Sequence, residues 1–320
     1  MISPDGIGKL RSMAAAMEPD LPASASVLKK LIEDFEGNGP VSRLIGEHPD
    51  SSHHFFGLRA LAGVRLLVLR GRAPELAAHL NKLTSNHGND SYNEVTWELS
   101  RRSILDNPAE MIEAMSRPIQ QHQPGRAALL LRGLGMLKAP RIRILELGAC
   151  AGLNLLLDKY RWFGGSWEWG DPDSPVRLSA AGPAPGDFTI VDRAGCDLAP
   201  LDPADPDDVM ILRSFIPPER EIDQMEQDDA IALASRTGLV IDKAHAIPWL
   251  TEKLAREDDH EDTLTVVWHS LFTQYLTVQE KSVIEEILTE ASYRMPLARV
   301  AAEPSDTFPG PPLLQVHVYA

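Results

Sequence analysis

The sequence predicts an α/β fold, in which a parallel sheet carries helices on both faces and follows a helical N-terminal region. Residues 1–117 place apolar side chains at helical spacing and show almost no alternation typical of strands. From residue 141 onward, short β-rich runs alternate with helical patterns, which is typical of a parallel sheet covered on both faces. With 320 residues the chain has room for two domains. We expect a helical region at 1–117 and an α/β domain at 118–320.

The elements follow from local patterns. In the helical region, Leu58, Leu61 and Val64 fall on one side of a helix that Gly71 is suited to end, and Pro74 is suited to begin the next. The strands expected in the α/β domain lie at 141–148, 188–198, 238–244, 264–270, 297–303 and 313–320. The helices expected between them lie at 153–160, 206–213, 219–235, 248–256 and 278–291. Residues 160–187 contain three tryptophans and are expected to form a packed turn or hairpin.

Composition excludes several classes of function. The chain carries 31 basic and 46 acidic residues, a formal net charge of −15, which disfavours nucleic-acid binding. Its two cysteines, Cys150 and Cys196, form neither a disulfide ladder nor a zinc motif, which suggests a reducing compartment. The N-terminus lacks the features of a secretory signal, and Arg65 interrupts the most apolar stretch. We therefore expect a cytoplasmic protein without a membrane partner.

One stretch, ILELGACAGLNLL at 144–156, carries the main chemical signal. In an open parallel sheet, ligands bind beyond the carboxyl ends of the strands, where the strand order reverses. Gly148 and Gly152 would let the backbone approach a ligand, and a helix starting near Leu153 would direct free N–H groups towards a carboxylate or phosphate. Glu146 could accept hydrogen bonds from a cationic amine.

The glycine spacing discriminates between ligands. A dinucleotide-binding GxGxxG would need glycines at the positions of Cys150 and Leu153, and a phosphate-binding loop would need a GK[ST] ending. A nicotinamide enzyme is therefore disfavoured. The run from Glu146 to Asn154 instead resembles the first motif of class I methyltransferases that use S-adenosylmethionine, with Cys150 in place of the middle glycine. A glycine-rich turn that binds nothing is the structural alternative.

A second feature fits the same resemblance. AGCDLAP at 194–200 is similar to the end of the second strand in such enzymes, where an acid binds the ribose hydroxyls. Asp197 is the first candidate for that contact, with Glu168 and Asp171 as rivals. At the end of the next strand, where these enzymes would place an aspartate near the adenine, this chain offers His245.

Four stretches extend the resemblance to a whole family: RPIQQHQPGR (117–126), ELGACAGLNLLLDKYRW (146–162), GCDLAPLD (195–202) and TVVWHSLFTQYL (265–276). They are similar to the bacterial "domain of unknown function 2332" family. The resemblance implies a Rossmann-like class I methyltransferase sheet behind a helical region, and no particular reaction. Residues 121–124 depart from the family pattern and lack its acidic residue. Family members usually continue through a further C-terminal strand, whereas this sequence stops at LLQVHVYA. We therefore expect an exposed sheet edge or a homo-oligomer that covers it.

Few catalytic groups are needed, because methyl transfer depends mainly on holding the reactants close and in line. His269 could take a proton from the nucleophile, Tyr275 could orient it, and Arg126 could reach over the cofactor. Hydrogen-bonded core and salt-bridge roles for these residues are equally open. HPDSSHH at 48–54 contains metal-ligand residue types, but a solvated loop is the preferred interpretation and no metal is expected.

Two hypotheses result. The first is S-adenosylmethionine-dependent methylation of an unidentified small molecule or protein side chain. The second is a degenerate methyltransferase fold that serves as a non-catalytic binding or assembly module, suggested by the altered positions at 121–124 and 245.

Overall fold

The structure is a computed structural model that describes residues 2–53, 55–83, 90–255, 262–304 and 312–319. It forms two compact units. The helical unit comprises Met1–Gln121 and Met210–Gln224, and the α/β unit comprises His122–Val209 and Met225–Ala320. The sequence division after residue 117 assigns 118–121 and 210–224 to the α/β domain. In the structure these segments belong to the helical unit, because Phe215 and Ile216 are buried there and Glu219 accepts hydrogen bonds from Ser24.

The N-terminal helical region is confirmed. Proline opens most of its helices, where the missing N–H is not needed. The helices are α1 (Pro4–Met17), α2 (Pro22–Glu36), α3 (Pro40–Ile45), α4 (Phe56–Leu69), α5 (Pro74–Leu83), α6 (Asp90–Asp106) and α7 (Pro108–Ser116), with a short 3-10 segment, η1 (Pro49–Ser52). Gly71 follows α4 with a φ of 72°, a left-handed conformation that suits glycine and ends the helix.

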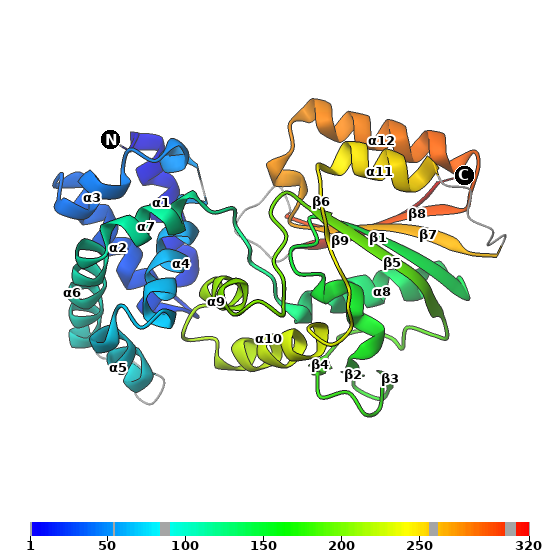
Figure 1. Cartoon of the computed structure of the whole chain (residues 1–320), viewed down its shortest axis with the longest axis horizontal. Coiled ribbons are helices and arrows are strands. Elements are labelled where there is room, and N and C mark those ends of the chain that lie inside the picture. Colours follow the sequence, from blue (N-terminus) through cyan, green and yellow to red (C-terminus); the bar gives the residue numbers. More distant parts are fainter. Residues whose placement is uncertain (1, 54, 84–89, 256–261, 305–311, 320) are drawn as a thin grey trace. The chain divides into compact units, whose positions relative to one another are not determined.

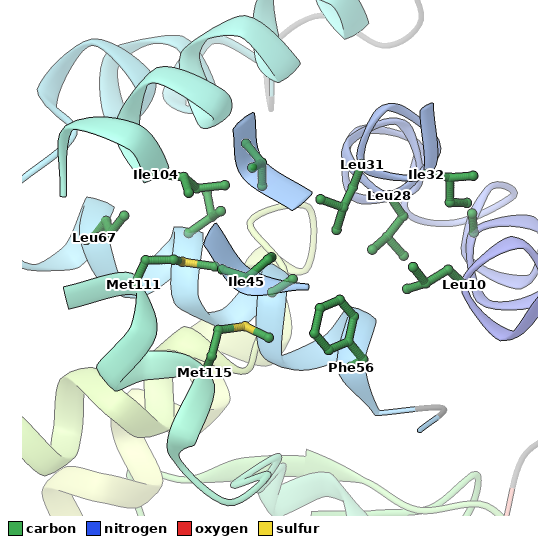
Figure 2. Packing of buried hydrophobic residues seen from close by; sticks show 14 of the residues in the cluster. Leu10, Leu28, Leu31, Ile32, Ile45, Phe56, Leu67, Ile104, Met111 and Met115 are labelled. Carbon is green, nitrogen blue, oxygen red and sulfur yellow. The ribbon is translucent and has the colours of Figure 1, made fainter. Parts of the chain in front are cut away.

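The helical unit has its own hydrophobic core. Figure 2 shows how Leu28 of α2, Phe56 of α4 and Met111 and Met115 of α7 point towards one another. Each of these side chains is at most 1% exposed. Burying a large apolar side chain contributes about 1.5–3 kcal/mol. Packing between helices therefore contributes strongly to the stability of this unit.

The α/β unit is built on a mostly parallel sheet, with the strand order β6-β5-β1-β7-β8-β9. Its strands are β1 (Arg141–Leu147), β5 (Thr189–Asp197), β6 (Asp242–Lys243), β7 (Leu264–Ser270), β8 (Leu297–Glu303) and β9 (Leu313–Tyr319). All pairings are parallel except that between β8 and β9. The chain builds outward from β1 through β5 to β6, and then returns to the other side of β1 with β7. The strand order thus reverses beside β1.

Helices cover both faces of this sheet (Figure 1). On one face, α11 (Ala246–Ala255) and α12 (Val278–Ser292) share a core with Leu145 and Leu147 of β1. On the other, α8 (Ala127–Leu137) packs so closely that a Cβ on Gly133 would lie 2.4 Å from Val300 of β8. The remaining helices are α9 (Pro206–Ser214), α10 (Glu221–Ala234), and the 3-10 segments η2 (Pro124–Arg126), η3 (Leu153–Lys159) and η4 (Thr273–Tyr275).

Three elements differ from the expectations. The helix expected at 153–160 is the 3-10 segment η3, and the strand expected at 238–244 shrinks to the two residues of β6. Residues 160–187 form a small second sheet from β2 (Arg161–Phe163), β3 (Glu168–Gly170) and β4 (Arg177–Ser179), in the order β3-β2-β4. Because β2 and β4 are parallel, this is more than a hairpin. In the part of the chain described, no helix combines the length and apolar character needed to cross a membrane.

Candidate functional site

The candidate site lies at the carboxyl end of β1, where the strand order reverses. Glu146 is the penultimate residue of β1 and is only 2% exposed. Its neighbours Leu145 and Leu147 face the core formed with α11 and α12, and side chains alternate along a strand. Glu146 therefore points to the opposite face, where η3 follows the loop.

The carboxyl group of Glu146 is incompletely hydrogen-bonded. Its Oε1 accepts from Nδ2 of Asn154 at 2.9 Å and from Nε1 of Trp268 at 3.0 Å, whereas the buried Oε2 has no hydrogen-bond partner. Burial raises the pKa of Glu146 to about 8, against the opposing effects of the two hydrogen bonds and a nearby guanidinium. At neutral pH the group is mostly neutral, with a proton available to leave.

His122 brings an unsatisfied donor to the same place. Its ring is 3% exposed, and its Nδ1 accepts the backbone N–H of Ala151 at 3.4 Å. The proton of the neutral ring therefore sits on Nε2, which has no hydrogen-bond partner. Burial and the charge of Arg126 lower the pKa of His122 to about 3, so the ring stays neutral. Asn154 lies close enough to oppose this shift, yet its Oδ1 and His122 Nε2 form no hydrogen bond of acceptable geometry.

Arg126 supplies the positive charge of the site. It belongs to η2, just before α8. Burial lowers the pKa of its guanidinium, while the negative charge of Glu146 raises it, as do, more weakly, Cys150, Tyr275 and Glu303. Arg126 remains charged, since arginine does not lose its proton in proteins. Arg126 therefore lies within electrostatic range of Glu146 and, with a weaker effect, of Tyr275.

Asp197, the last residue of β5, binds the backbone of the loop after β1. Asp197 Oδ2 accepts the backbone N–H of Cys150 at 3.0 Å, and its Oδ1 accepts that of Ala199 at 2.9 Å. Gly148, Cys150 and Gly152 all have positive φ angles, of 71°, 51° and 71°. The carboxylate therefore stabilises a loop conformation that costs energy at the non-glycine position.

The glycines of this loop make room for the chain's own side chains. A Cβ on Gly148 would lie 2.8 Å from Cδ2 of Phe272, and one on Gly152 would lie 2.8 Å from Cδ1 of Ile241. The loop is followed by a short 3-10 helix instead of the expected α-helix, so the N–H groups and dipole of an α-helix are not available there.

Burial and the charge of Asp197 raise the pKa of the Cys150 thiol well above its usual value, which excludes an activated thiolate.

A second polar cluster lies on the opposite face of the sheet. His269 pairs in register with Leu147 and lies on the face opposite to that of Trp268. Its Nδ1 lies 2.6 Å from Oε1 of Glu303, a residue at the end of β8 that is 6% exposed. Tyr275, in η4, is 48% exposed. His269 is thus a buried, oriented ring, whereas Tyr275 lies at the surface.

Residues 8–319 match a family described as "Uncharacterized protein conserved in bacteria (DUF2332)". The chain belongs to this family. No curated protein and no solved structure matches the sequence. Membership confirms the family resemblance over nearly the whole chain, while the methyltransferase relationship stays a prediction.

Among the acids considered for the ribose, only Asp197 contacts the loop that follows β1 in this DUF2332 chain. Glu168 and Asp171 are associated with the small second sheet, where Glu168 pairs with Arg161 and Asp171 accepts the N–H of Asp173. His245 follows β6 as an exposed side chain near Glu280. Of the residues at 48–54, position 54 lies outside the described residues, and the described part contains no cluster arranged to hold a metal ion.

Sequence reasoning missed three site residues of this DUF2332 member: His122, Trp268 as a donor to Glu146, and Glu303. A signal for Glu303 was present, because LARVAAE at 297–303 ends an apolar run in an acid, much as ILEL places Glu146 one residue before the end of its run. His122 carried no such signal, since only the folded chain brings its ring to Ala151, 29 residues away.

Proposed function

We propose that the α/β unit binds S-adenosylmethionine at the carboxyl end of β1 and transfers its methyl group to a small molecule or a protein side chain. The observation that carries the proposal is the buried Glu146 with an unpaired Oε2, at the point where the strand order reverses. A buried polar atom without a partner costs about 1–3 kcal/mol unless a ligand or water satisfies it.

The polar atoms around Glu146 match the amino-acid end of this cofactor. Glu146 Oε2 and Asn154 Oδ1 lack partners and could accept from an ammonium group. His122 Nε2–H and the positive charge of Arg126 could bind a carboxylate. One site therefore offers acceptors for a cation beside donors for an anion, as a zwitterion requires.

Asp197 is the proposed ribose contact. Each of its oxygens accepts one backbone N–H, and a carboxylate oxygen has a second lone pair for a hydroxyl donor. His245 is the proposed residue on the adenine side. Gly148, Cys150 and Gly152 would contribute through the shape of the loop backbone.

The cofactor would supply a methyl group on a positively charged sulfur, so the protein's task is mainly orientation. On the acceptor side, Glu303 fixes Nδ1 of His269 and leaves Nε2 as the nitrogen that exchanges a proton with the nucleophile. Tyr275 would orient that nucleophile from the surface of η4. Arg126 lies within electrostatic range of both Glu146 and Tyr275.

The test is calorimetric titration of the full chain with S-adenosylmethionine and S-adenosylhomocysteine, with NAD as a control. We expect micromolar binding, about −8 kcal/mol. In the protein without ligand, the pKa of Glu146 is about 8, so its carboxyl group is mostly protonated at neutral pH. A cation that binds the carboxylate form should therefore release close to one proton. The measured heat should therefore differ between phosphate and Tris buffers, which have different ionisation enthalpies.

Two variants of site residues, each paired with a control variant, sharpen this titration. Glu146→Gln should abolish the proton release and weaken binding at least tenfold, whereas Glu168→Gln, at an exposed position, should change neither. Asp197→Ala should weaken binding more than Asp171→Ala. No heat from a folded protein with either ligand would refute the cofactor proposal, and binding without proton release would refute the role of Glu146.

A second candidate function is a non-catalytic binding module. It is favoured by the side chains of Phe272 and Ile241, which fill the space over Gly148 and Gly152. This alternative predicts that S-adenosylmethionine either does not bind or binds without methyl transfer to any acceptor. The wild type and His269→Ala should then show the same absence of methyl transfer.

A further inference from the structure

The helical unit contains a partly enclosed cavity of about 100 Å³. Its walls are mainly apolar and include Val27 of α2, Leu58 of α4, Leu76 of α5, and Phe215 and Ile216. An apolar cavity of roughly 150 Å³ holds the six carbon atoms of benzene, so this smaller space suits a flexible hydrocarbon tail of about three to five carbon atoms. All of its lining residues belong to the helical unit, and none belongs to the Glu146 site.

One charged side chain, Arg65 of α4, lines this apolar space. Its Nη2 donates to Oε1 of Gln224 at 3.1 Å, but its Nε is buried and has no hydrogen-bond partner. A buried donor of a charged group is expensive to leave unsatisfied. The N–H groups of a guanidinium form a fork that matches the two oxygens of a carboxylate.

Glu219, the acid whose charge acts on Arg65, forms no hydrogen bond with its Nε. Glu219 raises the pKa of Arg65 through its charge, yet the described residues show no ion pair between them. The Glu219 carboxylate instead accepts from the backbone N–H of Ser24 at 2.8 Å and from its hydroxyl at 3.0 Å. Ser24 lies in the first turn of α2, whose N-terminus favours an anion. Glu219 therefore caps α2, and the Nε–H of Arg65 is left for another acceptor.

We propose that this cavity binds a short aliphatic carboxylate of about four to six carbon atoms. The hydrocarbon lies among the apolar side chains of α2, α4 and α5, and the carboxylate accepts hydrogen bonds from Arg65. This site is separate from the proposed methyl-transfer site and does not depend on it. A cation would be repelled by Arg65, and an alcohol would lack the charge that strengthens the bond.

The experiment titrates the full chain with four probes, hexanoate, butanoate, hexan-1-ol and hexylamine, using calorimetry and ligand-observed NMR. We expect hexanoate to bind at least tenfold more tightly than hexan-1-ol, butanoate to bind detectably, and hexylamine not to bind. Equal affinity for hexanoate and hexan-1-ol would refute the role of Arg65. Failure of every probe to bind the folded protein would refute the site.

Matched variants locate the binding. Arg65→Gln should reduce hexanoate binding to the level of hexan-1-ol, while Arg11→Gln, at an exposed arginine in the same unit, should have no effect. Ala62→Leu, which adds carbon atoms to the cavity wall, should abolish binding of both probes. If Arg65→Gln does not fold, Arg65→Lys keeps the charge without the fork and should weaken hexanoate binding severalfold. Hexanoate affinity that survives in Ala62→Leu would place the ligand elsewhere and overturn the proposal.

Discussion

Two glutamates at the carboxyl edge of the same sheet are both buried, and yet their pKa values are shifted in opposite directions. Glu146 at the end of β1 is 2% exposed and Glu303 at the end of β8 is 6% exposed. The pKa of Glu146 is raised to about 8, whereas that of Glu303 is lowered. Burial raises the pKa of both carboxyl groups, but at Glu303 the interactions with His269, Phe272 and Thr273 outweigh it, whereas at Glu146 the two hydrogen bonds do not.

The partners differ in number and in distribution over the two oxygens. Glu146 accepts two N–H bonds, both on Oε1. Glu303 uses both oxygens: Oε1 contacts His269 Nδ1 at 2.6 Å and the N–H of Phe272 at 3.0 Å, and Oε2 accepts the hydroxyl of Thr273 at 2.8 Å and its N–H at 3.2 Å. Both oxygens of Glu303 are hydrogen-bonded within the fold, so this carboxylate has a structural role. Glu146 keeps one oxygen without a hydrogen bond, so it can still bind a ligand.

The largest expected effect concerns the pH dependence of stability in Glu146→Gln. A carboxyl group whose folded pKa is raised stabilises the folded protein below its unfolded pKa, about 4.3, and this contribution is lost as the pH rises towards the folded value. Because the folded pKa is about 8, the wild type should lose about 4 kcal/mol relative to the variant across that interval. Urea unfolding followed by tryptophan fluorescence measures the difference at each pH.

Parallel stability curves for the two proteins would contradict this prediction. They would mean that Glu146 is ionised in the folded chain without any ligand. The comparison with Glu303 would then lose its basis, since both acids would be charged and only one would be satisfied.

A smaller effect is expected from Glu303→Gln. The amide of glutamine would present N–H groups to donors that need an acceptor, and the buried His269 would lose its carboxylate, so the variant should lose about 2–4 kcal/mol at neutral pH. Because the folded pKa of Glu303 is lowered, its contribution is present above the unfolded pKa of about 4.3 and is lost as the pH falls through the folded value. The penalty should therefore shrink in acid. Glu290→Gln, on the exposed surface of α12, is the control, and a penalty equal to that control would show that Glu303 is dispensable.

Local patterns predicted most of the elements but not their hydrogen bonding. The expected strand at 141–148 matches β1 (Arg141–Leu147). A strand buried on both faces has a nearly continuous apolar sequence, which can be recognised without knowledge of its neighbours. The helix expected at 153–160 is 3-10 because other side chains take its carbonyls: Tyr160 donates to Leu153, and Arg193 donates to Leu155. Arg193 lies 38 residues from its acceptor, so no local pattern could show the competition.

For the candidate site, too, local contacts could be predicted from the sequence and long-range hydrogen bonds could not. Glu146 and Asn154 belong to one short motif, and their hydrogen bond spans eight residues. The satisfaction of Glu303 depends on residues 30 to 34 positions away, and its difference from Glu146 arises only from which donors the fold delivers. Sequence reasoning can locate a buried acid at a strand end, but the folded structure is needed to decide whether that acid is available.

The smallest expected effect tests how Trp268 supports Glu146. Trp268→Phe removes the indole N–H that donates to Oε1, which should cost about 1–2 kcal/mol at about pH 5, where Glu146 is neutral. At about pH 9 the lost bond is one to an ionised carboxylate, and such bonds are worth about 1.5–3 kcal/mol, so the cost should increase. Unfolding measured in Glu146→Gln and in the double variant supplies the reference, because without an ionisable group the cost of Trp268→Phe should not depend on pH. An equal cost at both pH values in the wild-type background would show that the indole packs against Glu146 without tuning its charge.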